Sequence, residues 1–299
     1  MTHHKLTRRS FLKGVFAAGV ASAMPQSLMA LDSGPADLNC VALLSDPHVN
    51  TVLYKRTVAR ALAQAAAVPS GPANVILAGD LALNGRQKSY VSLGEVLDAA
   101  DLSRMKPHLM VGNHDRHTPF FEGLGKYAGK SPVTGRQVSL IETPNANWLL
   151  LDSMGEGDPR GWSGCSLGHK QISWLTHTLD AHKDKPAIVV AHHHLKVINW
   201  SRRPAPLEES DQVLGLLLAR PQVKAYINGH IHVWFTSQYR GLHLISLPSV
   251  SYTLPVTGGP LGWVLAQAKG DCLDLTLKAA NTRRKDHNQT LHLPYRTSA

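Results

Sequence analysis

Short apolar runs that alternate with longer amphipathic stretches constrain the fold more than any other feature of the sequence. Buried strands are short and rich in β-branched residues, and six runs fit that description: 40–45 (CVALLS), 74–78 (NVILA), 108–111 (HLMV), 148–151 (WLLL), 187–191 (AIVVA) and 224–227 (KAYI). Four intervening stretches have helical spacing: 51–67, 87–100, 167–182 and 208–219. Strands that alternate with helices indicate an α/β architecture.

The last part of the chain has a different character. From residue 235 to 277, short segments at 242–247, 263–267 and 273–277 are separated by glycine- and proline-rich turns. We expect antiparallel strands here, in a second sheet or at the far edge of the first. No linker divides residues 38–278, which predicts one domain. Residues 279–299 are polar and basic, and we expect a C-terminal tail.

Five of the apolar runs lead directly into residues that can bind a metal ion. In α/β sheets such side chains meet in a crevice beyond the carboxyl ends of the strands. Imidazole and carboxylate groups suit zinc, manganese and iron, and the absence of thiolates argues against a structural cysteine-type zinc site. The candidate ligands are Asp46, His48, Asp80, Asn113, His192, His230 and His232.

Two further residues are candidates for contact with a substrate. His192 directly follows its apolar run, so we expect it to be the ligand of the triplet His192-His193-His194. Of the other two, one is expected to face the substrate and one to lie behind the ligands, and His194 is the candidate for contact. Arg116 follows the Asn-His-Asp sequence closely enough to offer a bidentate fork to a phosphate. A solvated loop position is the equal alternative for Arg116.

The order of these motifs resembles that of the calcineurin-like metallophosphoesterases, and is most similar to their class III cyclic-nucleotide phosphodiesterase branch. The resemblance runs from Asp46 to His232 and consists of Asp46-x-His48, Gly79-Asp80, Gly112-Asn113-His114-Asp115, His192 after a strand, and Gly229-His230-x-His232. It implies a four-layer α-β-β-α sandwich of two mixed sheets flanked by helices. Leu83 stands where the purple acid phosphatase branch carries a tyrosine, which argues against that branch.

The resemblance also implies a chemistry for each residue. Asp46, His48 and His232 would bind one ion, Asn113, His192 and His230 a second, and Asp80 would bridge them with its two oxygens. The ions would be divalent or trivalent manganese, iron or zinc. Such sites hold two ions about 3.5–4 Å apart and activate a water molecule. His114 would protonate the leaving group, and Asp115 would orient His114 or support the loop.

The expected function is therefore hydrolysis of a small-molecule phosphate diester or monoester by a metal-bridging hydroxide. A 3′,5′-cyclic nucleotide is one candidate substrate. Two alternatives stay open: a non-catalytic interaction module on the same fold, and a periplasmic phosphomonoesterase. The net charge of +10 would suit binding to nucleic acid, but the basic residues are dispersed along the sequence. We therefore expect nucleic acid only as a substrate.

The N-terminus predicts export. Arg8-Arg9 and Phe11-Leu12-Lys13 precede an apolar stretch at 14–23 that is too short to span a bilayer as a helix. This order predicts a twin-arginine signal peptide over residues 1–30, recognition by the export machinery, and a periplasmic or otherwise extracytoplasmic protein without a stable membrane span after cleavage. Three cysteines cannot all pair within one chain, and we expect them to be structural or inert.

Overall fold

Two six-stranded mixed sheets form the centre of the structure, a computed structural model that describes residues 34–50, 52–155, 165–198, 205–254 and 259–297. The described residues belong to one unit, Gly34–Ala299. The predicted signal peptide, residues 1–30, lies outside them. In the first sheet the strand order is β12 (Thr290–Pro294), β11 (Cys272–Ala279), β10 (Gly262–Ala268), β1 (Asp37–Leu44), β2 (Pro72–Ala78) and β3 (Lys106–Met110).

The second sheet has the order β4 (Ser139–Glu142), β5 (Asn147–Leu151), β6 (Ala187–Ala191), β7 (Val223–Asn228), β9 (Leu242–Ser246) and β8 (Phe235–Tyr239). In each sheet a parallel core carries antiparallel strands at one or both edges. β1, β2 and β3 are parallel, as are β5, β6, β7 and β9.

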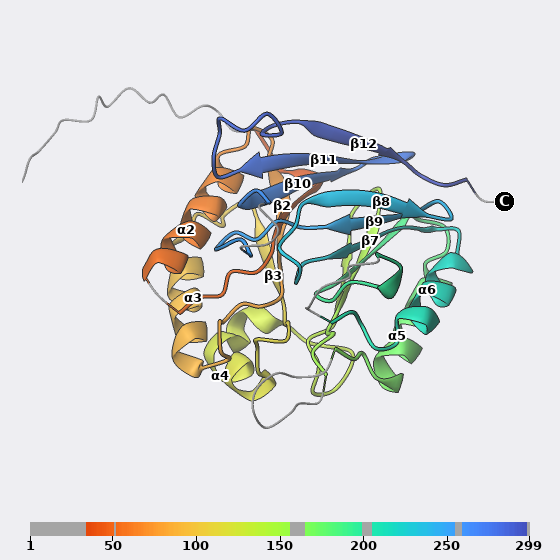
Figure 1. Cartoon of the computed structure of the whole chain (residues 1–299), viewed down its shortest axis with the longest axis horizontal. Coiled ribbons are helices and arrows are strands. Elements are labelled where there is room, and N and C mark those ends of the chain that lie inside the picture. Colours follow the sequence, from red (N-terminus) through yellow and green to blue (C-terminus); the bar gives the residue numbers. More distant parts are fainter. Residues whose placement is uncertain (1–33, 51, 156–164, 199–204, 255–258, 298–299) are drawn as a thin grey trace, which may run out of the picture. The chain divides into compact units, whose positions relative to one another are not determined.

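Helices cover the outer face of each sheet (Figure 1). The first sheet is covered by α2 (Val52–Ala66), α3 (Gln87–Ala99) and α4 (His117–Ala128), and the second by α5 (His169–Ala181) and α6 (Ser210–Leu218), with a 3-10 turn, η1 (Lys196–Ile198), before α6. The four-layer α-β-β-α sandwich is therefore confirmed.

Three apolar clusters match the three interfaces between these four layers. Alternate residues of β1 show the division: Val41 and Leu43 face the second sheet, while Ala42 and Leu44 face the helices. All four side chains are fully buried. A strand that is buried on both faces reads as a continuous apolar run rather than an alternating one. This explains why the runs were visible in the sequence.

The structure also differs from the sequence-based expectations. α4 was not expected, because its sequence contains Pro119, Gly123 and Gly125, which lower helix propensity. Packing of Phe120 and Leu124 in the core overrides that propensity. The last strands do not form a single antiparallel unit: β10, β11 and β12 extend the first sheet, whereas β8 and β9 complete the second.

The C-terminal residues belong to the sheet more fully than expected. Thr290–Pro294, within the expected tail 279–299, form β12 and pair with β11. Leu291 and Leu293 alternate with polar residues and pack against the core between the sheets. Two leucines in a short polar segment gave too weak a signal to be read as a strand. The three cysteines are buried free thiols, and no helix within the described ranges is long and apolar enough to cross a membrane.

Candidate metal centre

Five strand ends from both sheets deliver the seven candidate ligands to one place. The ligands follow β1, β2 and β3 of the first sheet and β6 and β7 of the second. None is more than 6% exposed. Buried polar groups of this number are retained only when they are paired with one another or with a bound ion. The seven residues thus form one cluster at the carboxyl ends of strands from both sheets.

The ligand atoms of the first triad lie close together. Asp46 Oδ1 is 3.1 Å from His232 Nε2, His48 Nε2 is 3.3 Å from His232 Nε2, and His48 Nε2 is 3.8 Å from Asp46 Oδ1. The three residues form one of the groups whose spacing fits a metal ion. The structure therefore brings together the residues predicted for the first position.

Asp80 lies between the two triads. Its Oδ2 is 3.6 Å from His48 Nε2 and 3.2 Å from His192 Nε2, so one oxygen faces ligands of both positions. Its Oδ1 instead accepts a hydrogen bond of 2.8 Å from the His114 backbone N–H. Oδ2 thus faces ligands of both positions, and the expectation that the two oxygens divide between two ions stays a prediction.

The second position combines Asp80, His192 and His230, which also form a group with metal-ligand spacing. His192 Nε2 is buried and makes no hydrogen bond within the described residues, although Asp80 Oδ2 is only 3.2 Å away. Two atoms that lie this close without a hydrogen bond between them are arranged like two ligands of one metal ion. Asn113, predicted as the remaining ligand, lies at the end of β3 and is 6% exposed.

Backbone carbonyls fix the orientation of three of the imidazoles. His192 Nδ1 is 2.8 Å from the carbonyl oxygen of Ala78, and His232 Nδ1 is 3.0 Å from that of Tyr252. His230 Nε2 is 3.1 Å from the carbonyl oxygen of Ala205. A histidine that donates one N–H to a carbonyl presents its other nitrogen as a metal ligand. His230 therefore presents Nδ1, whereas His192 and His232 present Nε2.

The backbone is strained at the ligands themselves. Five of the seven have φ in the left-handed region, which non-glycine residues rarely adopt: Asp46, His48, Asp80, His230 and His232. Such strain persists only where the surrounding structure determines it, and it concentrates at functional sites. Two neighbouring glycines are required by space: a Cβ at Gly112 would meet Asp80 Oδ1, and one at Gly229 would meet Ser45 Oγ.

The electrostatics of the cluster favour positive charge at its centre. Burial alone would raise the pKa of Asp46, but the adjacent His232 and His192 lower it to about 2. Burial opposes protonation of His192, but Asp80 and Asp46 raise its pKa to about 9. Burial lowers the pKa of His48 to about 4, which favours the neutral imidazole that a metal requires. These shifts, together with the donor set, fit divalent or trivalent ions.

His114 is the only imidazole of the predicted machinery that reaches the surface, with a side chain 19% exposed. Its Nδ1 is 2.6 Å from the Leu83 carbonyl oxygen, which fixes the ring. Its Nε2 then faces the centre and lies 4.0 Å from Asp80 Oδ2. This geometry allows Nε2 to exchange a proton with a bound molecule.

Asp115 supports the loops rather than touching the imidazole of His114. Its carboxylate accepts hydrogen bonds from the backbone N–H groups of Leu81, Ala82 and Gly112 and from the Tyr90 hydroxyl, at 2.9–3.0 Å. Burial and the nearby Asp80 raise the pKa of Asp115 to about 6, against these donors. Of the two roles expected for Asp115, the contacts match support of the loop.

The two candidates for substrate contact differ in exposure. His194 is 1% exposed, and its ring centroid is 6.0 Å from that of His230. Arg116 precedes α4, is partly exposed, and its side chain lies over Gly85. His193 is fully buried, with Nδ1 2.8 Å from Ser153 Oγ. Contact of His194 or Arg116 with a substrate stays a prediction.

Sequence reasoning missed Tyr252, which borders the first position. Its ring centroid is 4.9 Å from that of His48 and 4.8 Å from that of His232. The neighbouring Ser249 and Ser251 hydroxyls both donate to the Asp46 carbonyl oxygen. The segment lies after β9, beyond the last ligand motif, and no spacing within the sequence connects it to the site.

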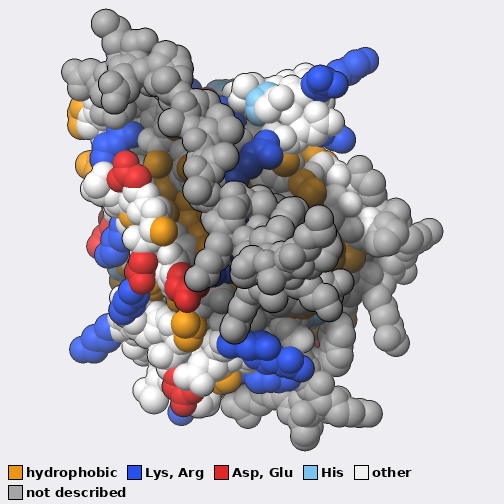
Figure 2. All heavy atoms as spheres, turned by 90° about the vertical axis from the view of Figure 1, so that its left-hand side faces the viewer, with side chains coloured by type: hydrophobic (Ala, Val, Ile, Leu, Met, Phe, Trp, Pro, Cys, Tyr) orange, Lys and Arg blue, Asp and Glu red, His pale blue; other side chains and the backbone are white. Residues whose placement is uncertain are grey.

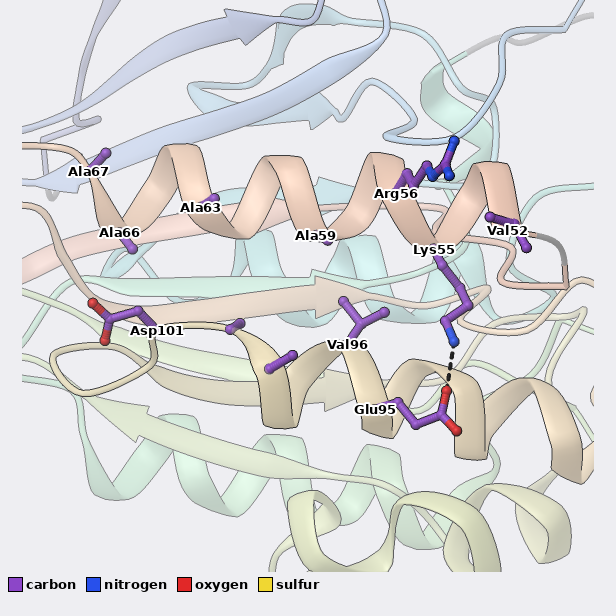
Figure 3. Close-up of a pocket in the computed structure, with 12 residues that line it drawn as sticks. Val52, Lys55, Arg56, Ala59, Ala63, Ala66, Ala67, Glu95, Val96 and Asp101 are labelled. Atoms are coloured by element: carbon purple, nitrogen blue, oxygen red, sulfur yellow. Dashed lines mark hydrogen bonds and ion pairs between the residues drawn. The ribbon is translucent and has the colours of Figure 1, made fainter. Parts of the chain in front are cut away.

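A separate hollow lies away from this cluster. A groove of about 630 Å³ runs between α2 and α3, and an ion pair of 2.6 Å between Lys55 and Glu95 spans it (Figure 3). The face that includes these helices shows hydrophobic side chains among charged ones (Figure 2). Alanine methyl groups form much of the groove, and none of the predicted ligands lines it. We therefore assign the candidate active site to the ligand cluster at the carboxyl ends of the strands and not to this groove.

The chain is similar to known proteins in sequence and in fold. Residues 41–234 match the family model of the calcineurin-like phosphoesterases. The chain is 29% identical over 188 residues to the glycerophosphodiester phosphodiesterase GpdQ of Enterobacter lignolyticus, which covers 62% of this chain and 64% of that protein. It is also 29% identical over 182 residues to the 3′,5′-cyclic adenosine monophosphate phosphodiesterase CpdA of Haemophilus influenzae, which covers 59% of this chain and 61% of that protein.

The matched segment thus spans less than two thirds of either relative. Among solved structures, a dimetal phosphatase from Danio rerio superposes with a TM-score of 0.66 at 16% identity, which covers 88% of this chain and 100% of that one. At that level of identity the likeness concerns the fold.

Proposed function

The chain belongs to the calcineurin-like phosphoesterase family, and on that premise we propose that it is a metal-dependent phosphodiesterase. The observation that carries the proposal is the position of Asp80 Oδ2, which faces His48 Nε2 at 3.6 Å and His192 Nε2 at 3.2 Å. One carboxylate oxygen between two sets of imidazoles is an arrangement that can bridge a pair of ions.

Asp46, His48, His232 and Asp80 would hold one ion, and Asp80, Asn113, His192 and His230 the other. Two bound ions neutralise phosphate oxygens and supply a nucleophile at neutral pH. The carbonyl of Leu83 keeps the ring of His114 in place, so that Nε2 faces a bound ester. From there it donates a proton to the leaving alkoxide.

The names of the two relatives support a diester over a monoester as substrate, since one is a glycerophosphodiester phosphodiesterase and the other a cyclic adenosine monophosphate phosphodiesterase. The proposal is tested with protein reconstituted with Mn(II) and its metal content measured on the same sample. We expect faster hydrolysis of bis(p-nitrophenyl) phosphate than of p-nitrophenyl phosphate. Fully loaded protein without turnover on these or on a 3′,5′-cyclic nucleotide would favour an interaction module instead.

The role of His114 has a separate test. The variant His114→Ala should keep both ions and lose activity chiefly on alkyl esters, because p-nitrophenolate leaves without needing a proton. General acid catalysis typically contributes about 10²–10⁴-fold. Metal content and rates on both ester types are measured together. Equal losses on aryl and alkyl esters would contradict the acid role.

We also propose that residues 1–30 direct export by the twin-arginine machinery, so that the enzyme works outside the cytoplasm. Support comes from the order of Arg8-Arg9, Phe11-Leu12-Lys13 and the apolar stretch at 14–23. Changing both arginines to lysine should leave the precursor in the cytoplasm, as measured by cell fractionation. Unchanged export of that variant would contradict the proposal.

A further inference from the structure

The first metal position has a neighbour that the sequence motifs do not include. The Tyr252 hydroxyl lies 3.4 Å from His48 Nε2. The backbone of the same residue is tied to the site, because its carbonyl oxygen lies 3.0 Å from His232 Nδ1. Two contacts with two different ligands hold the phenol against the first position.

The distances match those between ligand atoms of one ion. His48 Nε2 lies 3.3 Å from His232 Nε2, 3.6 Å from Asp80 Oδ2 and 3.8 Å from Asp46 Oδ1, and His232 Nε2 lies 3.1 Å from Asp46 Oδ1. Atoms bound about 2.0–2.1 Å from the same ion are separated by about 3–3.5 Å at octahedral or tetrahedral angles. The 3.4 Å between the Tyr252 hydroxyl and His48 Nε2 matches this separation.

A hydrogen bond to His48 does not account for the hydroxyl once an ion is bound. His48 Nε2 is the nitrogen that faces Asp46, Asp80 and His232, so a metal would take its lone pair. His48 Nδ1 is buried and has no hydrogen-bond partner within the described residues. The phenol oxygen would then lie beside the ion, with its former acceptor occupied.

We propose that Tyr252 Oη is a fifth protein ligand of the first metal position, beside Asp46, His48, Asp80 and His232. The phenol oxygen would bind the ion as the phenolate, and its proton would pass to solvent. The inference rests on the two-metal site proposed above. It also assigns a ligand that motif order could not supply: Leu83 follows Asp80 where the purple acid phosphatase branch carries its tyrosine, and here a phenol reaches the same cluster from the segment after β9.

The test uses the full chain reconstituted with Fe(III). A phenolate bound to Fe(III) gives a charge-transfer band in visible light. We expect wild-type protein to be coloured and Tyr252→Phe to be colourless at equal iron content. Tyr54→Phe is the matched control, because the Tyr54 ring lies 5.9 Å from that of Tyr252 and belongs to α2. It should keep the band.

Colourless wild-type protein with two ions bound would overturn the inference, as would a band that survives in Tyr252→Phe. If the chain takes up no iron, chelator competition with Zn(II) decides. Tyr252→Phe should then weaken Zn(II) binding at the first position by about tenfold or more, and an unchanged affinity would overturn the inference. Active wild-type protein with two ions and no effect of Tyr252→Phe would contradict this inference alone. Failure to bind two ions would contradict the proposed function.

Discussion

The two proposed metal positions would share Asp80 but differ in the ligands that each would hold alone. The first adds a carboxylate, Asp46, to its imidazoles, and Tyr252 borders it. The second has no carboxylate of its own, and its further ligands are an amide and two imidazoles. Two buried histidines, His193 and His194, lie beside it. Carboxylates would therefore neutralise more of a bound ion's positive charge at the first position than at the second.

This difference predicts unequal affinity. An ion at the first position faces two carboxylates, and an ion at the second shares only Asp80. In a buried site the attraction between opposite charges is stronger than in water. The first position should therefore fill first and hold its ion more tightly, and the second should exchange more readily.

Removing the shared carboxylate should have the largest effect, because it damages both positions at once. Asp80→Ala should lower kcat by about 10³-fold or more, the size of loss seen when charge stabilisation of a transition state is removed. Steady-state rates on bis(p-nitrophenyl) phosphate measure it. Wild-type turnover in this variant would contradict the two-metal mechanism.

Exchanging the ligand types between positions sharpens the comparison. Asp46→Asn should weaken the tighter site by about 10–100-fold, since a ligand charge is lost. Asn113→Asp should strengthen metal binding at the second position and reduce the difference in affinity between the two positions. Stepwise metal titration of each variant measures both constants. If neither variant changes the difference in affinity, ligand charge does not decide which position binds its ion first.

Asp115 ties the loop of the second position to the loop after Asp80. It accepts N–H groups from Gly112 on one side and from Leu81 and Ala82 on the other. In Asp115→Asn an amide NH₂ replaces one acceptor oxygen and leaves buried donors unpaired, which costs about 2 kcal/mol of folding stability. Thermal unfolding of metal-free protein measures the loss. Asp101→Asn, at an exposed residue that accepts from Ser103, is the control.

Acidity should affect metal binding in a defined direction. The pKa of His192 is raised to about 9 by Asp80 and Asp46 against the effect of burial, and that of His232 is also raised, by Asp46. Both are protonated below their pKa values, and an ion must displace those protons. Affinity should fall as pH drops below 9, by up to about tenfold per unit for each proton. Calorimetry in buffers of different ionisation enthalpy should show proton release, and the absence of release at pH 7 would contradict these shifts.

The parts of the site that follow buried strands could be predicted from sequence, because a continuous apolar run and the residue after it are both visible locally. Asp80 and His192 are examples. Tyr252 could not be predicted, since it reaches the site through a segment that has no motif. The different contacts of the two Asp80 carboxylate oxygens could not be predicted from the sequence either, because they depend on where the His114 backbone N–H points. α4 and β12 were missed where packing outweighs local propensity.

The most direct test of the dinuclear centre is electron paramagnetic resonance of protein loaded with Mn(II) to saturation. Two Mn(II) ions bridged by one oxygen are magnetically coupled, and their spectrum differs from that of an isolated ion. We expect two ions per chain and a coupled spectrum that Asp80→Ala abolishes. One ion per chain at saturation, or two ions with only the isolated Mn(II) spectrum, would contradict the dinuclear centre.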